Sequence, residues 1–351
     1  MAQLQQALVI LSPGFPENEA DTTCLPAHQV FIRAVNKNFP DLKVIILALQ
    51  YPFAAHDYVW FGNRVISFNG GRHRKIGRLL FWVKIWGVLK ALQNEHSLLG
   101  LLGFWFNEYA LVGKYFAKAH RVKHYSWITG QDAKKGNLFV KLVKPKPNSL
   151  IAMSDFLAKQ FYTNYKVQPG FIVPNGIDIA MFGAEKMERC IDVFAAGSLI
   201  PLKQYDVFVD VVKLIAEKLP GLQAVLCGKG PEENNLVKRI AAYGLDENIQ
   251  LAGERKHNEV LGLMQQSKVF LHTSNYEGFS TVCLEALYAG AYVVSFFQPM
   301  VKPIENWYIV QNMEEMAQKA LSILIDPKIV YKPVLAFSMD DVAKQIVRLY
   351  K

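Results

Sequence analysis

Short apolar runs alternate with longer amphipathic stretches through the first half of the chain. The apolar runs predict buried strands at residues 6–11, 43–50, 98–106, 123–129, 149–153 and 171–173. The stretches between them predict helices at 26–39, 71–90, 107–120 and 155–164. Strands that alternate with helices at this spacing indicate parallel pairing, because a crossover helix returns the chain to the same edge.

The second half repeats the same rhythm after a charged stretch that ends near residue 189 and is interpreted as an interdomain linker. Strands are predicted at 192–196, 224–227, 249–252 and 268–272, and helices at 204–219, 233–243, 258–266 and 340–350. A length of 351 residues exceeds the usual size of one core. We therefore predict an α/β fold of two doubly wound, parallel-sheet domains facing a cleft. The predicted parts are residues 1–178, residues 190–335, and a C-terminal helix at 336–351 that packs back toward the first domain.

Charge is distributed unevenly, and this narrows the choice of partners. The chain carries a net charge of +9, of which residues 1–180 hold 21 basic against 10 acidic side chains. A basic domain is expected to meet an anionic partner, either nucleic acid or a negatively charged membrane surface. The first residues lack the features of a signal peptide and no apolar run reaches 18 residues, so we expect a cytoplasmic protein. Four separated cysteines without a C-x-x-C pair argue against a zinc site or disulfides.

The stretch 71–90 combines a basic start with a broad apolar face. Its basic residues are predicted to contact anionic lipid headgroups on the membrane or acceptor face of the first domain. They are Arg72, Arg74, Lys75 and Arg78. The alternative is a helix packed into the core with solvated basic ends.

The most informative stretch is 275–290, where a strand, a glycine-bearing loop and a helix follow one another. Ser280 is a candidate N-cap, which would leave backbone N–H groups of the first turn directed at an anion such as phosphate. Glu277 precedes the helix and Glu285 lies within it, so two carboxylates flank a gap the size of a diphosphate. Each carboxylate could accept hydrogen bonds from hydroxyl groups on its side of the gap. The alternative is an ordinary helix without a bound ligand, in which one glutamate caps the start and a second glutamate lies on the exposed face.

Further glycine-bearing loops follow other predicted strands. They include Gly14 after the first strand, 130–136 with Asp132, 197–203 with Lys203, and 228–232. The carboxyl ends of parallel strands are where open sheets bind their ligands. Each loop is therefore a candidate part of a binding site.

Together these loops resemble those of the retaining nucleotide-sugar glycosyltransferases of family 4, which have the GT-B architecture. Glu277 and Glu285 match the family's E-x7-E signature. The loops 197–203 and 228–232 resemble its G-R-L-x-x-x-K and G-x-G-P-E loops, and 173–178 resembles its interdomain turn. The resemblance covers most of the second half of the chain and less of the first.

The resemblance implies transfer of a sugar from a nucleotide diphosphate donor to a hydroxyl of a glycan or lipid-linked acceptor. This activity would fit cell-envelope polysaccharide synthesis. It implies that Glu277 faces the sugar, Lys203 neutralises the diphosphate, and Glu285 binds the ribose. Asp132 is implied as a third catalytic residue. The remaining implied donor-binding residues are Gly14, Ser198, Gly278, Phe279, Ser280 and Thr281.

Two positions depart from the family pattern. Ser198 stands where many members have arginine, and Thr129 stands where many have the histidine of an H-G-x-D loop. No D-x-D motif is present, and we expect neither a metal nor another cofactor.

Three other functions are alternatives to this one. An epimerase of the same architecture would use the same phosphate loops without an acceptor. A basic nucleic-acid-binding module is another alternative. The chain has neither the interleaved aromatic residues nor a recognised motif of such a module, so we expect no nucleic acid as a partner. A dinucleotide oxidoreductase is disfavoured because no G-x-G-x-x-G follows a strand.

Overall fold

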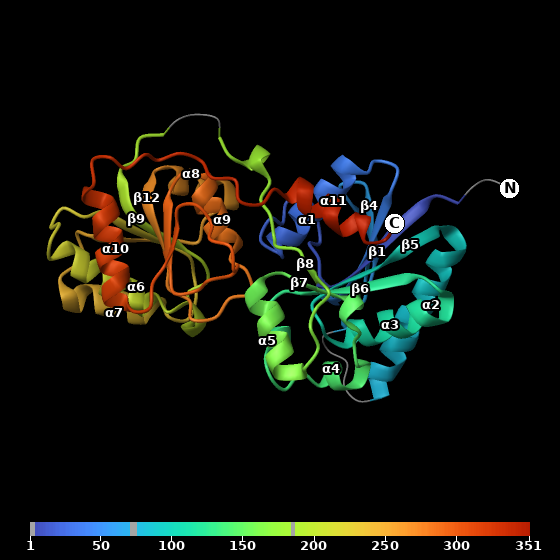
Figure 1. Cartoon of the computed structure of the whole chain (residues 1–351). Helices are drawn as coiled ribbons and strands as arrows, with labels where there is room; N and C mark the ends of the chain where they lie inside the picture. The colour runs from blue at the N-terminus through green and yellow to red at the C-terminus, as the bar shows by residue number, and fades with distance from the viewer. Residues whose placement is uncertain (1–3, 71–75, 184–186) are drawn as a thin grey trace. The chain divides into compact units, whose positions relative to one another are not determined.

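The computed structural model describes residues 4–70, 76–183 and 187–351. By its internal contacts the chain forms two compact units. Unit 1 is Met1–Gly176 together with Met339–Lys351, and unit 2 is Ile177–Ser338. Each unit has a mainly parallel sheet covered by helices (Figure 1).

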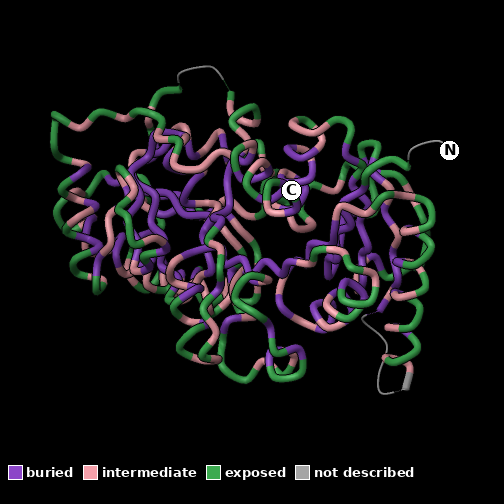
Figure 2. The backbone as a smooth tube through the Cα atoms, turned by 45° about the vertical axis from the view of Figure 1, so that its right-hand side comes forward, coloured by how far each residue is buried: buried purple, intermediate pink, exposed green. Residues whose placement is uncertain are grey.

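Unit 1 is built on a sheet of eight strands in the order β3-β4-β2-β1-β5-β6-β7-β8. All neighbours pair in parallel except β3 and β4, which are antiparallel. The strands are β1 (Gln6–Gly14), β2 (Lys43–Tyr51), β3 (Asp57–Trp60), β4 (Asn63–Ser67), β5 (Ser97–Phe104), β6 (Lys123–Ile128), β7 (Leu150–Ala152) and β8 (Phe171–Ile172). The central strands β1, β2 and β5 are buried along most of their length, and Figure 2 shows buried backbone in the interior of the molecule.

The helices of unit 1 follow the predicted amphipathic stretches, except that the helix predicted at 71–90 ends five residues beyond the predicted end, at Glu95. They are α1 (Pro26–Asn38), α2 (Ile76–Glu95), α3 (Glu108–His120), α4 (Leu138–Val143), α5 (Asp155–Tyr165) and α11 (Met339–Arg348). Of these, only the short α4 has no counterpart in the sequence prediction.

The C-terminal helix α11 belongs to unit 1 and packs against α1. Asp340 at its start pairs with Lys37 (2.6 Å) and accepts a hydrogen bond from Asn38 (2.8 Å). Just beyond its end, the buried Tyr350 donates to the Leu101 carbonyl at 2.8 Å. Gly100 makes room for this ring, since a Cβ there would lie 2.3 Å from the Tyr350 Cε1 atom.

Unit 2 has a six-stranded, fully parallel sheet in the order β11-β10-β9-β12-β13-β14. Its strands are β9 (Ile191–Ala196), β10 (Ala224–Cys227), β11 (Ile249–Gly253), β12 (Ser267–His272), β13 (Tyr292–Ser295) and β14 (Trp307–Ile309). Its helices are α6 (Tyr205–Ala216), α7 (Glu233–Tyr243), α8 (His257–Gln265), α9 (Thr281–Tyr288) and α10 (Met313–Ile325). The main core of unit 2 joins α6 and α10 to the sheet through residues such as Phe208, Val212 and Ile323.

The hairpin of β3 and β4 is the main addition to the predicted fold of unit 1. Its turn consists of Phe61 and Gly62, whose φ angles are +41° and +77°. Two consecutive positive φ angles are typical of a type I′ turn, which suits the twist of a two-residue hairpin. The sequence pattern did not predict it, because each strand is short and β3 alternates only weakly between buried and exposed positions.

Candidate functional site

The site predicted in unit 2 lies where the strand order of the sheet reverses. From β9 the chain moves outward to β10 and β11, and then returns to place β12 on the other side of β9. Ligands of open α/β sheets bind at such a switch point, outside the carboxyl ends of the strands. The loop after β9 carries Lys203 in a 3₁₀ turn (Pro201–Lys203), and the loop after β12 carries Glu277.

The two loops are tied together directly. The ammonium group of Lys203 forms an ion pair with Glu277 Oε1. The hydroxyl of Thr273, one residue after β12, donates to the Lys203 carbonyl at 2.7 Å. The structure thus brings together two residues that the sequence analysis assigned to one site, and it adds Thr273 as the residue that holds their loops in register.

His272 lies behind this pair and was not among the predicted site residues. It is the last residue of β12, only 5% exposed, with its Nε2 atom 3.7 Å from Glu277 Oε1. That distance is too long for a hydrogen bond, and within the described residues neither ring nitrogen has a hydrogen-bond partner. Burial lowers the pKa of His272, so the imidazole is neutral at pH 7. Its position at the carboxyl end of a central strand was the signal in the sequence.

Glu277 is held in its charged form. Burial alone would raise its pKa, but the polar ring of His272, which acts across 3.7 Å without a hydrogen bond, and the Lys203 ammonium outweigh that effect and lower the pKa to about 2. The group is therefore a fixed acceptor at any physiological pH. It can receive hydrogen bonds from hydroxyl groups and cannot supply a proton.

Glycines allow the backbones of the loops after β9 and β10 to approach each other closely. A Cβ on Gly228, whose φ is +154°, would lie 1.9 Å from the Gly197 carbonyl oxygen, and one on Gly230 would lie 2.3 Å from that of Leu199. Backbone hydrogen bonds from Leu199 to Lys229 (3.0 Å) and from Glu232 to Leu199 (3.0 Å) join the loops. We call residues 197–203 and 228–232 the double loop. Ser198 lies on its exposed side.

The start of α9 follows Glu277 closely in the chain. Ser280 occupies the N-cap position as predicted, but its side chain makes no capping hydrogen bond. Phe279 is 5% exposed and packs edge-on against Trp307 and Phe337, with centroids 6.3 and 5.8 Å apart. This packing anchors the loop, of which Gly278 is also buried. The roles of Gly278, Phe279, Ser280 and Thr281 in phosphate binding stay predictions.

Glu285 lies in the second turn of α9, within the helix as predicted. It has a partner that the sequence analysis did not name, since His257 Nε2 lies 2.8 Å from Glu285 Oε1. His257 is the first residue of α8. The hydrogen bond to Glu285 raises the pKa of His257, against the opposing effect of burial.

In unit 1 the carboxylate of Asp132 is occupied by backbone donors. Oδ2 accepts from the Phe106 N–H at 2.8 Å, and Oδ1 accepts from Gly130 at 2.8 Å and Thr129 at 3.2 Å. Burial raises its pKa despite these hydrogen bonds. The contacts give Asp132 a structural role, joining the loops that follow β5 and β6, and its catalytic role stays a prediction. The Thr129 hydroxyl is buried without a partner in the described part of the chain.

Gly14 is the last residue of β1, where the strand order of unit 1 also reverses, between β1 and β5. A Cβ at this position would lie 3.2 Å from the Tyr51 Cβ, so a side chain fits poorly. The close approach of its backbone to a donor stays a prediction.

The predicted basic cluster is only partly described. Arg72, Arg74 and Lys75 lie outside the described residues. Arg78 departs from the expected lipid contact, because its guanidinium binds Glu108 at 2.6 and 2.7 Å. Glu108 is 2% exposed, begins α3 and also accepts a hydrogen bond from Trp82 (3.0 Å). Arg78 therefore neutralises a buried carboxylate inside unit 1.

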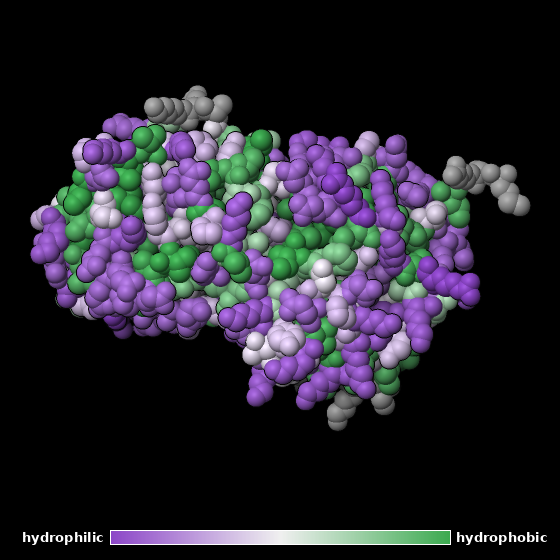
Figure 3. Space-filling view, viewed as in Figure 1, coloured by the Kyte–Doolittle hydropathy of each residue, from purple (hydrophilic) through white to green (hydrophobic). Residues whose placement is uncertain are grey.

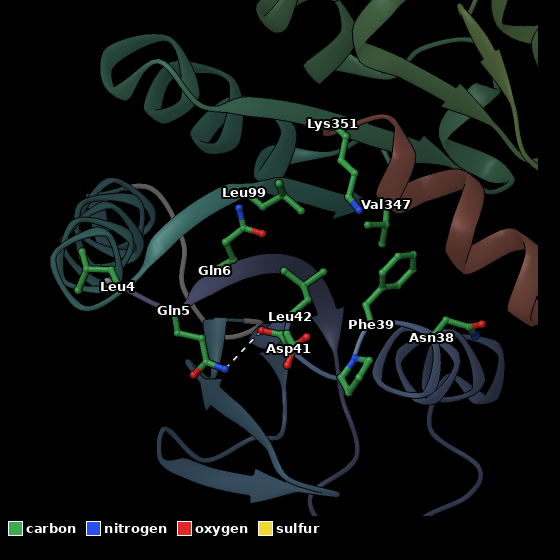
Figure 4. Close-up of a pocket in the computed structure, with 11 residues that line it drawn as sticks. Leu4, Gln5, Gln6, Asn38, Phe39, Asp41, Leu42, Leu99, Val347 and Lys351 are labelled. Atoms are coloured by element: carbon green, nitrogen blue, oxygen red, sulfur yellow. Dashed lines mark hydrogen bonds between the residues drawn. The ribbon is translucent and has the colours of Figure 1, made fainter. Parts of the chain in front are cut away.

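A cavity of about 590 Å³ lies elsewhere in unit 1, away from these carboxyl ends. Figure 4 shows its lining at the starts of β1 and β5, with Phe39, Val347 and Lys351 beside Gln6 and Leu99. It contains none of the predicted site residues. Within residues 4–70, 76–183 and 187–351, no three His, Cys, Asp or Glu side chains are grouped as metal ligands would be. None of the helices described is long and apolar enough to cross a bilayer.

Part of unit 2, including the loops described above, is similar to known proteins. Residues 178–331 match the family model described as glycosyl transferases group 1. The chain is 26% identical over 193 residues to a phosphatidylinositol N-acetylglucosaminyltransferase subunit of Arabidopsis thaliana, covering 51% of this chain and 43% of that protein. It is 30% identical over 103 residues to the 2-deoxystreptamine N-acetyl-D-glucosaminyltransferase of Niallia circulans, covering 29% and 26%. The chain thus spans less than half the length of each of these relatives.

Solved structures show the fold. Sucrose-phosphate synthase from Thermosynechococcus elongatus aligns with a TM-score of 0.72 at 16% identity over 99% of this chain and 98% of that one. The Anabaena protein HepE, in complex with UDP and glucose, aligns at 0.66 and 16% identity over 98% and 97%. The predicted fold class is confirmed: the chain has the two Rossmann-like domains of the GT-B fold.

Proposed function

We propose that this chain is a metal-independent, retaining glycosyltransferase of family 4 that uses a nucleotide diphosphate sugar as its donor. The ion pair of Lys203 and Glu277 at the switch point of unit 2 carries the proposal. It places one cation and one fixed carboxylate beside the double loop, with Glu285 further along α9. A diphosphate bonded to a sugar on one side and to a ribose on the other has the complementary groups, namely phosphate oxygens for the cation and hydroxyl groups for the two carboxylates.

Each residue has a separate task in this proposal. The Lys203 ammonium moves from Glu277 to the diphosphate and stabilises the charge that develops as the sugar leaves. Glu277, charged at all physiological pH values, accepts hydrogen bonds from hydroxyls of the transferred sugar. Glu285 accepts hydrogen bonds from the ribose. A resident ammonium supplies the positive charge that a divalent ion supplies elsewhere, which is the basis for proposing independence of metal.

The acceptor is proposed to be a hydroxyl of a glycan or a lipid-linked glycan, bound by the basic unit 1. Residues 1–180 hold an excess of 11 positive charges, which suits an anionic acceptor or surface. Retention of configuration follows if the departing diphosphate accepts the proton of the attacking hydroxyl on the same face of the sugar. Assembly of a cell-envelope polysaccharide at the cytoplasmic face of a membrane is the setting we propose.

One feature of unit 1 supports contact with a membrane. Leu79, Leu80 and Val83 on α2 are 58%, 66% and 67% exposed. Their spacing places them on one side of the helix. Exposed apolar side chains near basic ones are typical of helices that lie in a bilayer interface. Hydrophilic residues cover much of the face shown in Figure 3, with smaller apolar areas among them.

Binding and turnover test the proposal in sequence. Thermal unfolding is measured with UDP-, GDP- and ADP-sugars, beginning with UDP-N-acetylglucosamine, because the relatives' names specify that sugar. A donor at 100 times its dissociation constant adds about 2.7 kcal/mol to the apparent stability. Release of nucleotide is then followed with an acceptor, with and without EDTA. Loss of turnover in EDTA would refute independence of metal, and isomerised sugar without acceptor would indicate an epimerase.

A further inference from the structure

His257 occupies a position from which it can act on the ribose side of the proposed donor site. It is the first residue of α8, and its ring reaches Glu285 in the second turn of α9. The helices α8 and α9 lie side by side in unit 2 (Figure 1). Because a carboxylate only accepts hydrogen bonds, the imidazole must donate its Nε2–H to Oε1, across 2.8 Å.

The geometry leaves one carboxylate oxygen of Glu285 available. His257 engages Oε1, and within the described residues no hydrogen bond to Oε2 is present. The two side chains are only 21% and 13% exposed, so the contact is partly shielded from water. A glutamate side chain has several rotatable bonds, and holding it in one arrangement has an entropic cost that a ligand must otherwise supply. His257 supplies that restraint before a ligand binds.

We infer that His257 is a positioning residue that orients Glu285 so that its second carboxylate oxygen receives the ribose hydroxyls of the donor. The inference rests on the proposed function, because it assumes that Glu285 binds a ribose. It adds a residue of α8 to a site otherwise formed by the double loop and 275–290. His257 touches neither the sugar nor the diphosphate in this arrangement, so it affects the affinity of the nucleotide and leaves the chemical step unchanged.

The charges around His257 favour this pairing. Glu285 is the acidic group that contacts the ring from α9, and its hydrogen bond raises the pKa of His257. On its own turn, Lys256 and Glu259 are the titratable neighbours, and Glu259 accepts the Lys256 backbone N–H at 2.8 Å. A cation at a helix N-terminus is disfavoured by the helix dipole. The carboxylate of Glu285, at 2.8 Å, supplies an opposite charge that offsets this effect.

Isothermal titration with two nucleotides tests the inference. The probes are UDP and 2′,3′-dideoxy-UDP, which keeps the diphosphate and base but lacks both ribose hydroxyls; if UDP does not bind, the matching ADP and GDP pairs are used. The variants are H257A, H257Q and, as a control in the same turn, N258A, whose side chain is exposed. H257Q retains a neutral hydrogen-bond donor.

H257A is expected to weaken UDP binding roughly tenfold, about the value of one hydrogen bond to a charged group. It should leave binding of the dideoxy nucleotide unchanged. H257Q should restore part of the UDP affinity, N258A should match the wild type, and turnover at saturating donor should be unaltered by H257A. Equal losses for both nucleotides, or no loss for UDP, would overturn the inference while leaving the proposed function intact. A wild-type protein that binds no nucleoside diphosphate would overturn both.

Discussion

Lys203 and Glu277, 74 residues apart in the sequence, form an ion pair across the loops that follow β9 and β12. The pair is largely buried, with side-chain exposures of 21% and 19%. Removing one partner of such a pair leaves a charge without compensation. In the proposed reaction, the diphosphate and a sugar hydroxyl of the donor would give each group a new partner.

Substitution of either residue should abolish transfer. K203M and E277Q keep the approximate size of the side chains and remove one charge each. We expect each to lower kcat by at least about a hundredfold, since electrostatic groups at the reacting centre typically contribute that much or more. Nucleotide release is measured beside K218M, which removes an exposed lysine in the turn that follows α6. Near-wild-type turnover in K203M or E277Q would refute the site, provided both variants show native circular dichroism.

The lowered pKa of Glu277 predicts how acid affects stability. The folded-state pKa of about 2 lies below its ordinary value of 4.5, so the carboxylate stabilises the folded protein above pH 4.5. This contribution, up to about 3 kcal/mol, is lost as the pH falls from 4.5 toward 2. The difference in unfolding free energy between wild type and E277Q, measured with urea, should therefore shrink over that range. A constant difference would show that the charge of Glu277 is not what stabilises the loops.

The double loop should not tolerate a side chain at Gly228. A methyl group there would lie 1.9 Å from the Gly197 carbonyl oxygen, and the φ of +154° is one that other residues rarely adopt. We expect G228A to lower the unfolding free energy of unit 2 by more than about 2 kcal/mol and to weaken nucleotide binding strongly. G262A is the matched control, because nothing lies within 4 Å of a Cβ at that helical position. An equal response of the two variants would refute the close packing of the loops.

Arg78 should matter for the stability of unit 1. R78Q removes the charged partner of Glu108, which is 2% exposed. We expect the unfolding free energy to fall by roughly 3 kcal/mol, because a buried carboxylate loses its countercharge. K90M, which neutralises an exposed lysine on the same helix, should have little effect. Chemical unfolding of both variants checks this, and a loss for R78Q no greater than for K90M would mean that the pair is not formed in solution.

Membrane contact is best tested without altering Arg78. Neutralising Arg72, Arg74 and Lys75 together should reduce sedimentation with liposomes that contain anionic lipid, because each basic residue near such a surface contributes about 1 kcal/mol. Replacing Leu79, Leu80 and Val83 by serine should reduce it further, whereas serine at the exposed Val237 of α7 should not. Unchanged sedimentation in both sets of variants would rule out this face of unit 1 as the contact.

Local sequence patterns were sufficient for the class of fold and for naming the candidate site residues, whose roles stay predictions. Apolar runs bounded by glycine loops, repeated in both halves, predict two parallel sheets, because periodicity and loop chemistry are local properties. Lys203, Glu277 and Glu285 were named from glycine-bearing loops and from the resemblance of their spacing to a family pattern. The hairpin of β3 and β4 was not predicted, because short strands give a weak local signal.

Which groups meet depends on the three-dimensional fold. The Lys203–Glu277 pair, the His257 contact to Glu285 and the burial of His272 require β9 and β12 to lie side by side and α8 to pack against α9. Arg78 and Asp132 likewise acquired partners inside unit 1. Such contacts join residues far apart in the chain, so no local pattern encodes them, and a charged side chain looks equally suited to solvent, lipid or a buried partner until the fold is formed.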